Sequence, residues 1–266
     1  MKSKRMCMAL AFLLGAGTLL SGCGISSGQK GTLTVGVRDD IVNFGFQNKE
    51  TGRYFGLEID IAEEMAKRMG YSKVEYVTVV PDDRKEVLLE GDVDCLVACY
   101  SIADSRLENF DFSPAYYTDT TDIMVENSSL ITSLEEMQDM TIGIMSGSNA
   151  GPLLANKLYE MGMITDVVVS NTDEGTEYEG MHVKKFESYQ AVSDALEEGV
   201  VDGACMDGSI ANTYMNEERT ILGINIAEQN YGVATQKGSE LSQPVADTIQ
   251  EMLDDGTIET MIDKWD

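Results

Sequence analysis

The chain has 266 residues, and its 46 acidic residues outnumber 19 basic ones, which gives a formal net charge of −27 at pH 7. This excess of negative charge excludes proteins that hold nucleic acid or anionic lipid by electrostatic attraction. The single histidine, His182, has no second ligand near it in the sequence, and the five cysteines are not spaced like zinc ligands. We therefore expect no metal, no cofactor and no nucleic-acid partner.

Residues 1–23 have the pattern of an export signal. Three basic side chains lie among the first five residues, and residues 6–20 form an apolar run too short for a comfortable membrane span. Leu20-Ser21-Gly22-Cys23 follows and resembles the lipobox of bacterial lipoproteins, in which the cysteine is lipidated and begins the mature chain. An ordinary signal peptide cut nearby is the alternative. Residues 24–31 (GISSGQKG) are predicted to be a flexible tether.

Two short segments recur later in the chain. Leu33–Val37 (LTVGV) returns as Met140–Ile144 (MTIGI), and Glu90–Asp94 (EGDVD) returns as Glu198–Asp202 (EGVVD). The aligned glycines are 107 residues apart in the first pair (36 and 143) and 108 apart in the second (91 and 199). Chance recurrence of strand-like runs is the alternative, but the shared offset favours two lobes of like topology.

Apolar periodicity predicts alternating strands and helices in each half. In the first half we expect strands at 32–37, 74–80 and 93–98, and helices at 58–69 and 82–90. In the second half we expect a capping box at Ser133–Glu136, strands at 141–144, 167–169 and 201–206, a helix at 188–198, and a solvated acidic loop at 171–180. Residues 225–235 are predicted to be extended, and helices at 241–253 and 258–265 follow. This alternation indicates an α/β protein with parallel sheets buried on both faces.

A polar turn follows the expected strand at 93–98 and contains Ser101 and Arg106. Ligands of open α/β sheets bind beyond the carboxyl ends of the strands. A hydroxyl group and a guanidinium group in one turn suit a carboxylate, because the guanidinium fork matches two oxygens. A surface arginine in a polar loop is the alternative.

The stretch around this turn resembles the family-3 solute-binding proteins of amino-acid ABC importers. The family pattern G-x-v-D, an apolar strand, T-i-T-x-x-R and v-d-F-S-x-P-Y-Y is matched by Gly91–Asp94, Ser101–Arg106 and Phe110–Tyr117. Ser101 and Ala103 replace the usual threonines, and Cys99 replaces glycine or serine. The resemblance covers almost everything after Gly31.

The resemblance implies a two-lobed fold like that of periplasmic binding proteins of type II. Each lobe would be a mostly parallel sheet flanked by helices, with the ligand cleft between the lobes. Residues 32–124 and 231–266 would form lobe 1 and residues 125–230 lobe 2, with strands crossing between them near 123–127 and 227–233.

The resemblance also implies a site for the backbone of an amino acid. Arg106 and Ser101 would take the α-carboxylate, and Asp207 and the main-chain carbonyl of Cys99 would take the α-ammonium group. The internal repeat agrees, because Cys99 and Asp207 each lie five residues after the repeated aspartate, at the ends of equivalent strands.

Other residues are expected around this site. Ser148 and Asn149 open a helix after a strand, where free N–H groups suit a carboxylate, a simple N-cap being the alternative. Phe44 is expected to wall the side-chain pocket, with Phe46 or Tyr100 as alternatives. Arg84 either reaches the pocket or supports the packing.

Arg38 follows the first strand and is expected at the floor of the pocket, where arginine resembles the binders of acidic amino acids. A buried guanidinium needs a partner, and a ligand carboxylate would provide one. Asp39 and Asp40 are the competing partners, and either one would leave the pocket neutral.

The expected function is that of the substrate-binding lipoprotein of an ABC importer, which captures glutamate, aspartate or glutamine by hinge closure. We expect a monomer that is not an enzyme, held at the cell membrane by the lipid on Cys23 and facing the extracellular side or the periplasm. Its partners would be the amino acid and the membrane permease. The alternatives are an enzyme similar to cyclohexadienyl dehydratase and an amino-acid sensor domain on the same fold.

Overall fold

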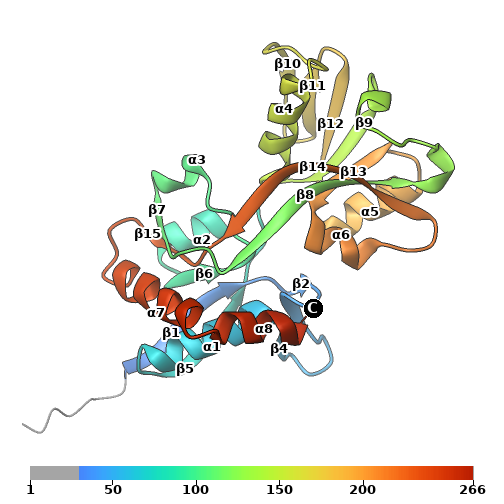
Figure 1. Cartoon of the computed structure of the whole chain (residues 1–266). Coiled ribbons are helices and arrows are strands. Elements are labelled where there is room, and N and C mark those ends of the chain that lie inside the picture. Colours follow the sequence, from blue (N-terminus) through green and yellow to red (C-terminus); the bar gives the residue numbers. More distant parts are fainter. Residues whose placement is uncertain (1–29, 266) are drawn as a thin grey trace, which may run out of the picture.

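The computed structural model describes residues 30–265, so the predicted export signal, Cys23 and most of the predicted tether lie outside the described residues. Two β-sheets with helices packed on them form two lobes, and the long strands β8 (Tyr117–Glu126) and β14 (Arg219–Tyr231) run between them (Figure 1). The lobe boundaries expected at 124 and 231 fall on these two strands.

The first lobe is built on a five-stranded sheet in the order β5-β1-β6-β15-β7. These strands are β1 (Lys30–Val37), β5 (Tyr71–Thr78), β6 (Cys95–Val97), β7 (Phe110–Phe112) and β15 (Ala234–Gln236). A smaller sheet contains β2 (Asp40–Ile41), β3 (Gly45–Gln47) and β4 (Tyr54–Phe55). The helices are α1 (Leu57–Arg68), α2 (Arg84–Glu90), α3 (Asp104–Leu107), α7 (Ser242–Asp254) and α8 (Thr257–Trp265). The last two return to this lobe and pack on α1 (Figure 1).

The second lobe is built on a seven-stranded sheet in the order β10-β11-β12-β9-β13-β8-β14. Besides β8 and β14 it contains β9 (Thr141–Met145), β10 (Val168–Asn171), β11 (Gly175–Tyr178), β12 (Met181–Phe186) and β13 (Gly203–Asp207). Its α-helices are α4 (Ala150–Glu160), α5 (Tyr189–Glu197) and α6 (Gly208–Tyr214), and two 3-10 turns occupy Asn127–Ser129 and Glu135–Met137.

The two sheets repeat one topology. The parallel trio β5-β1-β6 of the first lobe corresponds to β12-β9-β13 of the second, and an antiparallel strand follows each trio, β15 in one lobe and β8 in the other. The repeated aspartates make the same contact, because Asp94 accepts a hydrogen bond from the amide of Thr34 at 2.7 Å and Asp202 accepts one from Thr141 at 2.9 Å. The repeat in the sequence therefore reflects equivalent strand ends.

The structure corrects three expectations about local structure. The sheets are mixed rather than mostly parallel, since antiparallel strands flank each parallel trio. The predicted acidic loop at 171–180 contains β11, which pairs with both β10 and β12. The predicted capping box at Ser133 is absent from the 3-10 turn there, and the side chain of Glu136 accepts from the amide of Thr132 at 2.8 Å instead.

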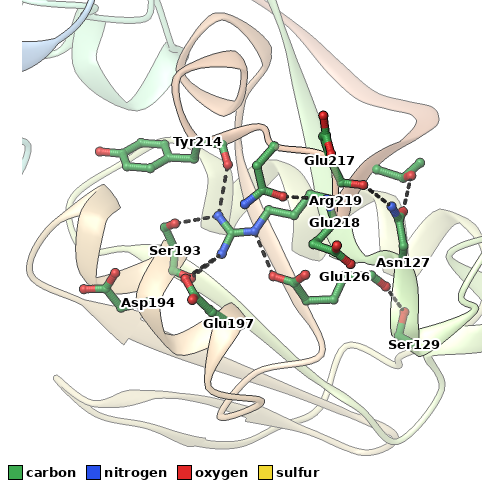
Figure 2. A network of polar contacts seen from close by, with 12 residues as sticks. Glu126, Asn127, Ser129, Ser193, Asp194, Glu197, Tyr214, Glu217, Glu218 and Arg219 are labelled. Carbon is green, nitrogen blue, oxygen red and sulfur yellow. Dashed lines mark hydrogen bonds and ion pairs between the residues drawn. The ribbon is translucent and has the colours of Figure 1, made fainter.

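A buried arginine ties the second lobe together (Figure 2). The Arg219 side chain on β14 is 2% exposed, and its Nε donates to Glu126 Oε1 on β8 at 2.8 Å. Its Nη1 donates to Ser193 Oγ on α5 at 2.7 Å and to the carbonyl of Tyr214 at the end of α6 at 3.0 Å. One guanidinium thus joins two strands and two helices, and a buried charge of this kind is costly to leave unpaired.

Replacing Arg219 with methionine keeps most of the side-chain volume but leaves Glu126 without its partner. We expect the Arg219→Met variant to lose about 3 kcal/mol of stability, as when one member of a buried ion pair is removed. Urea denaturation followed by circular dichroism measures the loss. Arg53→Met, at an exposed position, is the matched control. Equal midpoints for the two variants would show that the Arg219 network does not hold the lobe together.

Candidate functional site

The structure brings together three predicted site residues around one unpredicted side chain, Gln229 on β14. Ser101 Oγ donates to Gln229 Oε1 at 2.5 Å, and Asn149 Nδ2 donates to the same oxygen at 3.1 Å. Gln229 Nε2 donates to Asp207 Oδ1 and, at 2.7 Å, to Thr121 Oγ1. Ser101 follows β6, Asn149 precedes α4 and Asp207 ends β13, so the cluster lies where both lobes meet the crossing strand.

Asp207 is the anionic group of this cluster. It is 5% exposed, and its Oδ2 accepts a hydrogen bond from Tyr231 Oη at 2.5 Å. Burial raises the pKa of Asp207 to about 6, against the hydrogen bond from Tyr231, which lowers it. A cation placed beside this carboxylate would hold it in the ionised form.

Arg106 is one of two guanidinium groups on the cationic side. Its Nη1 donates to the carbonyl of Ser101 at 2.7 Å, and its guanidinium carbon lies 4.2 Å from the centre of the Tyr100 ring. Burial and then the nearby charge of Arg84 lower the pKa of Arg106 to about 10. Within residues 30–265 it has no carboxylate in ion-pair contact, so its charge is only partly compensated.

Arg84, the first residue of α2, is the second guanidinium group. It is 3% exposed, and its Nη1 donates to the carbonyls of Ala98 and Cys99 at 2.7 and 3.3 Å. Its carbon lies 4.4 Å from the centre of the same Tyr100 ring, and its buried Nε has no hydrogen-bond partner among the described residues. Burial lowers the pKa of Arg84, and the charge of Arg38 lowers it further. Arg84 therefore packs against the strand end that carries Cys99 and Ser101, with its Nε left unpaired within the described part of the chain.

Both backbone polar groups of Cys99 are hydrogen-bonded to buried charged side chains. Cys99 has a left-handed backbone with φ of 45°, its amide donates to Glu58 Oε1 at 2.5 Å, and its carbonyl accepts from Arg84. Glu58 also accepts from Tyr116 Oη at 2.5 Å, and burial raises the pKa of its carboxyl group. Glu58 thus supports the strand end from which the site is built.

Arg38 is buried as expected, but it has a carboxylate partner within the protein. Its side chain is 1% exposed, and its Nε and Nη2 donate to the two oxygens of Asp40 at 3.0 and 2.7 Å. The guanidinium carbon lies 5.6 Å from the centre of the Tyr189 ring on α5. Of the partners that the sequence left open for Arg38, the structure shows Asp40.

Phe44 and Ser148, two further residues expected at the site, make hydrogen bonds or ring contacts with residues outside the cluster around Gln229. Phe44 packs edge-on against Tyr117, with ring centres 4.9 Å apart, and lines a groove of about 430 Å³ together with Asp119 and Trp265. Ser148 Oγ donates to the carbonyl of Met145 at 2.7 Å, a local turn contact. Of the two residues expected before α4, Asn149 is the one that contacts the central cluster.

Sequence reasoning missed Gln229, Tyr231 and Tyr189. Gln229 and Tyr231 lie in the stretch expected to be extended, and both are buried while Asn230 between them is exposed. Alternate side chains of a strand point to the same side. This alternation along the expected extended stretch could have identified Gln229 and Tyr231 as candidates. Tyr189 begins α5 after its capping residue Ser188, and no local pattern distinguishes it from a core aromatic residue.

The chain was compared with known protein families, curated proteins and solved structures. Residues 33–266 match the family model of the bacterial extracellular solute-binding proteins, family 3. The chain belongs to this family.

Several relatives are similar to this solute-binding protein over most of their length. The glutamine-binding protein GlnH of Bacillus subtilis is 26% identical over 88% of this chain and 80% of its own. The L-cystine-binding protein TcyJ of Escherichia coli is 26% identical over 89% of this chain and 83% of its own. The structure of an ancestral arginine-binding protein bound to glutamine is 28% identical, with a TM-score of 0.74, and the match covers 89% of this chain and 98% of that one.

Within residues 30–265, no helix has the length and apolar character needed to cross a membrane. In the same range no group of three histidine, cysteine, aspartate or glutamate side chains is arranged to hold a metal ion. Cys95, Cys99 and Cys205 are buried thiols that form no disulfide.

The two lobes of the binding protein touch at one edge of the site. Ser146 Oγ donates to Asp82 Oδ1 at 2.8 Å, which joins the loop before α4 to the loop before α2. Gly147 has a φ of 68°, and a Cβ atom there would lie 2.6 Å from the carbonyl group of Pro81. Only glycine allows the two backbones to approach so closely.

We expect Gly147→Ala to keep the lobes apart at this edge. The matched control is Gly162→Ala, because Gly162 has a similar φ of 71° but no neighbouring atom within 4 Å of the place that a Cβ atom would take. Both variants carry the strain of a left-handed alanine, about 1–2 kcal/mol, but only Gly147→Ala should increase the radius of gyration in small-angle X-ray scattering. The same radius for both variants would show that the contact at Pro81 does not set the distance between the lobes.

Proposed function

We propose that this protein is the substrate-binding component of an amino-acid ABC importer and that it captures a polar, preferably acidic L-amino acid. The observation that carries the proposal is the pair of opposite charges at the meeting point of the lobes, with Arg106 on one side and Asp207 on the other. A zwitterion needs a cation for its carboxylate and an anion for its ammonium group. Arg106 and Ser101 would take the α-carboxylate, with Asn149 beside them, and Asp207 the α-ammonium group.

Binding would take place by closure of the lobes around the ligand, with β8 and β14 as the connecting strands. Closure removes the charged groups from water, which strengthens their attraction to the ligand. The contact between Ser146 and Asp82 supports this mechanism, because it joins the two lobes beside the site. We propose that the protein acts as a monomer and delivers its ligand unchanged to a membrane permease, rather than catalysing a reaction.

The preference for an acidic ligand rests on Arg84. Arg38, from which an acidic ligand was expected, is neutralised by Asp40. Arg84 and Arg106 instead contact the same Tyr100 ring, and both rely on backbone carbonyls rather than on carboxylates of the described chain. One α-carboxylate compensates one of these two charges. A second carboxylate on the ligand would compensate the other and reach the unpaired Nε of Arg84, as glutamate or aspartate would.

We expect Arg106→Ala and Asp207→Asn each to abolish binding of every amino acid, because both residues would contact the part that all amino acids share. Loss of one member of a buried charge pair costs roughly 2–5 kcal/mol, or about 30-fold to several thousand-fold in affinity. A thermal-shift screen of the amino acids identifies the ligand, and calorimetry measures the loss. Arg53→Ala and Asp173→Asn, both at exposed positions, are the controls. A site variant that binds within a few-fold of wild type would remove its residue from the site.

The acidic preference is tested by comparing Arg84→Gln with Arg38→Gln. We expect Arg84→Gln to weaken L-glutamate at least about tenfold more than L-glutamine, since a charge-assisted hydrogen bond is lost only for the acid. Arg38→Gln should affect both amino acids to a similar degree, because its partner is Asp40. A wild-type protein that prefers L-glutamine, together with an Arg84→Gln variant that keeps this preference, would contradict the acidic assignment while leaving the binding of amino acids intact.

We further propose that a lipid on Cys23 anchors the protein to the cell membrane, with its lobes on the extracellular side or in the periplasm. The lipobox-like Leu20–Cys23 supports this anchor, and two acyl chains together hold a protein stably at a bilayer. Cys23→Ala should release the protein into the medium or leave it uncleaved at its leader, as fractionation and mass spectrometry would detect. Cleaved Cys23→Ala protein that stays with the membrane after high-salt and carbonate washing would contradict the anchor.

A further inference from the structure

Gln229 is a buried amide with an unusually complete set of partners. It is 2% exposed, and both ends of the amide make two hydrogen bonds, to Ser101 and Asn149 at the oxygen and to Asp207 and Thr121 at the nitrogen. The orientation of the amide follows from chemistry, because an ionised carboxylate only accepts hydrogen bonds. The nitrogen must therefore face Asp207, and the oxygen must face Ser101 and Asn149.

These partners match those assigned to the backbone of an amino acid. An amino acid presents an acceptor, its carboxylate, to Ser101 and Asn149, and a donor, its ammonium group, to Asp207. The Gln229 amide presents a neutral acceptor and a neutral donor to the same three side chains. The side chain is thus an uncharged copy of the ligand backbone, carried on the strand that connects the lobes.

We propose that Gln229 is a built-in competitor of the amino acid, which links the two lobes by occupying the backbone-binding groups and is displaced when the ligand binds. This inference rests on the proposed function for the identity of the displacing molecule. The link itself is a property of the protein alone, since Ser101 belongs to the first lobe and Asn149 and Asp207 belong to the second.

At Ser101, the number of protons on the hydroxyl group requires competition. The hydroxyl group of Ser101 has one proton to donate, and it donates this proton to Gln229 Oε1. The same hydroxyl cannot donate to an α-carboxylate until Gln229 withdraws. At Asp207, Oδ2 already accepts from Tyr231 and Oδ1 accepts from Gln229, so an ammonium group must take its place among existing donors.

The amino acid would bind these groups more strongly than the Gln229 amide does, because its carboxylate and ammonium groups carry full charges. A hydrogen bond in which the donor or the acceptor is ionised is roughly twice as strong as one between neutral groups. The amide makes such a bond only to Asp207, whereas the amino acid would make one to Ser101 and Asn149 as well. The ligand carboxylate would also reach Arg106, whose guanidinium donates to the Ser101 carbonyl. The neutral amide is therefore strong enough to hold the lobes together, yet weak enough to be displaced.

The test replaces Gln229 with methionine, which has a similar volume and shape but cannot make these hydrogen bonds. The control is Asn230→Met, one residue further along β14 on its exposed face. Small-angle X-ray scattering without amino acid measures the distance between the lobes. Calorimetry with L-glutamate and L-glutamine, the two probe ligands, measures affinity.

We expect Gln229→Met to increase the radius of gyration of the protein without amino acid, and Asn230→Met to leave it unchanged. We also expect Gln229→Met to bind its amino acid about fivefold more tightly than wild type, because the ligand no longer has to break the hydrogen bonds of the amide. An unchanged radius would overturn the link between the lobes. Weaker binding would overturn the competition and make Gln229 a ligand-binding residue.

A second measurement does not depend on the variant being well folded. The side-chain amide protons of Gln229 are assigned in the NMR spectrum of the wild-type protein, and their exchange with water is followed with and without L-glutamate or L-glutamine. We expect slow exchange without amino acid and faster exchange, with a shifted resonance, at saturation. Protection that is unchanged at saturation would overturn displacement. If neither amino acid binds wild type, the proposed ligands fail while the scattering comparison still tests the link.

Discussion

The charge of the candidate site depends on how two buried guanidinium groups, those of Arg38 and Arg84, and the partly buried one of Arg106 are compensated. Arg38 is paired with Asp40 in a two-point contact, whereas Arg84 and Arg106 rely on backbone carbonyls and on the faces of the Tyr100 ring. Carbonyls and aromatic faces stabilise a cation without cancelling its charge. The protein therefore keeps positive charge on one side of the site, and the buried carboxylate of Asp207 provides the opposite charge.

The repeated topology explains why these groups meet. Each lobe holds its central strands in the same order, and an aspartate of each lobe, Asp94 or Asp202, is tied to the strand beside it. Cys99, which follows β6, and Asp207, which ends the equivalent strand β13, consequently belong to one region. Because β14 passes through this region on its way back to the first lobe, its alternate side chains Gln229 and Tyr231 complete the polar network.

The hydrogen bonds around the site form two sets, one within the first lobe and one between the lobes. The hydrogen bonds around Glu58 and Arg84 hold Cys99 in a left-handed conformation, so that they support the shape of the strand end. Those around Gln229 connect residues of different lobes. In the proposed function, contacts within a lobe would preorganise the site, and contacts between lobes would govern its opening.

Helices and strands with a regular spacing of apolar residues could be predicted from the sequence. The repeated segments of the sequence indicated two lobes of like topology. Apolar spacing predicted the repeated strands and the helices α1, α5, α7 and α8, because it records which face of each element is buried. A strand was expected at 167–169, where β10 lies, but β11 was missed, because its residues are all only partly buried and leave no apolar pattern. Ser101, Asn149 and Asp207 were expected near one site, and the structure brings them together around Gln229.

Only the tertiary structure decided which polar groups pair. The sequence offered Arg38 two neighbouring aspartates and a ligand, and the backbone between β1 and β2 directs Asp40 to it. Ser101 and Gln229 are 128 residues apart, and Asn149 and Gln229 are 80 apart. Hydrogen bonds form only within about 3.5 Å and in a narrow range of angles. Such contacts are therefore set by the placement of whole strands, which no local pattern of residues records.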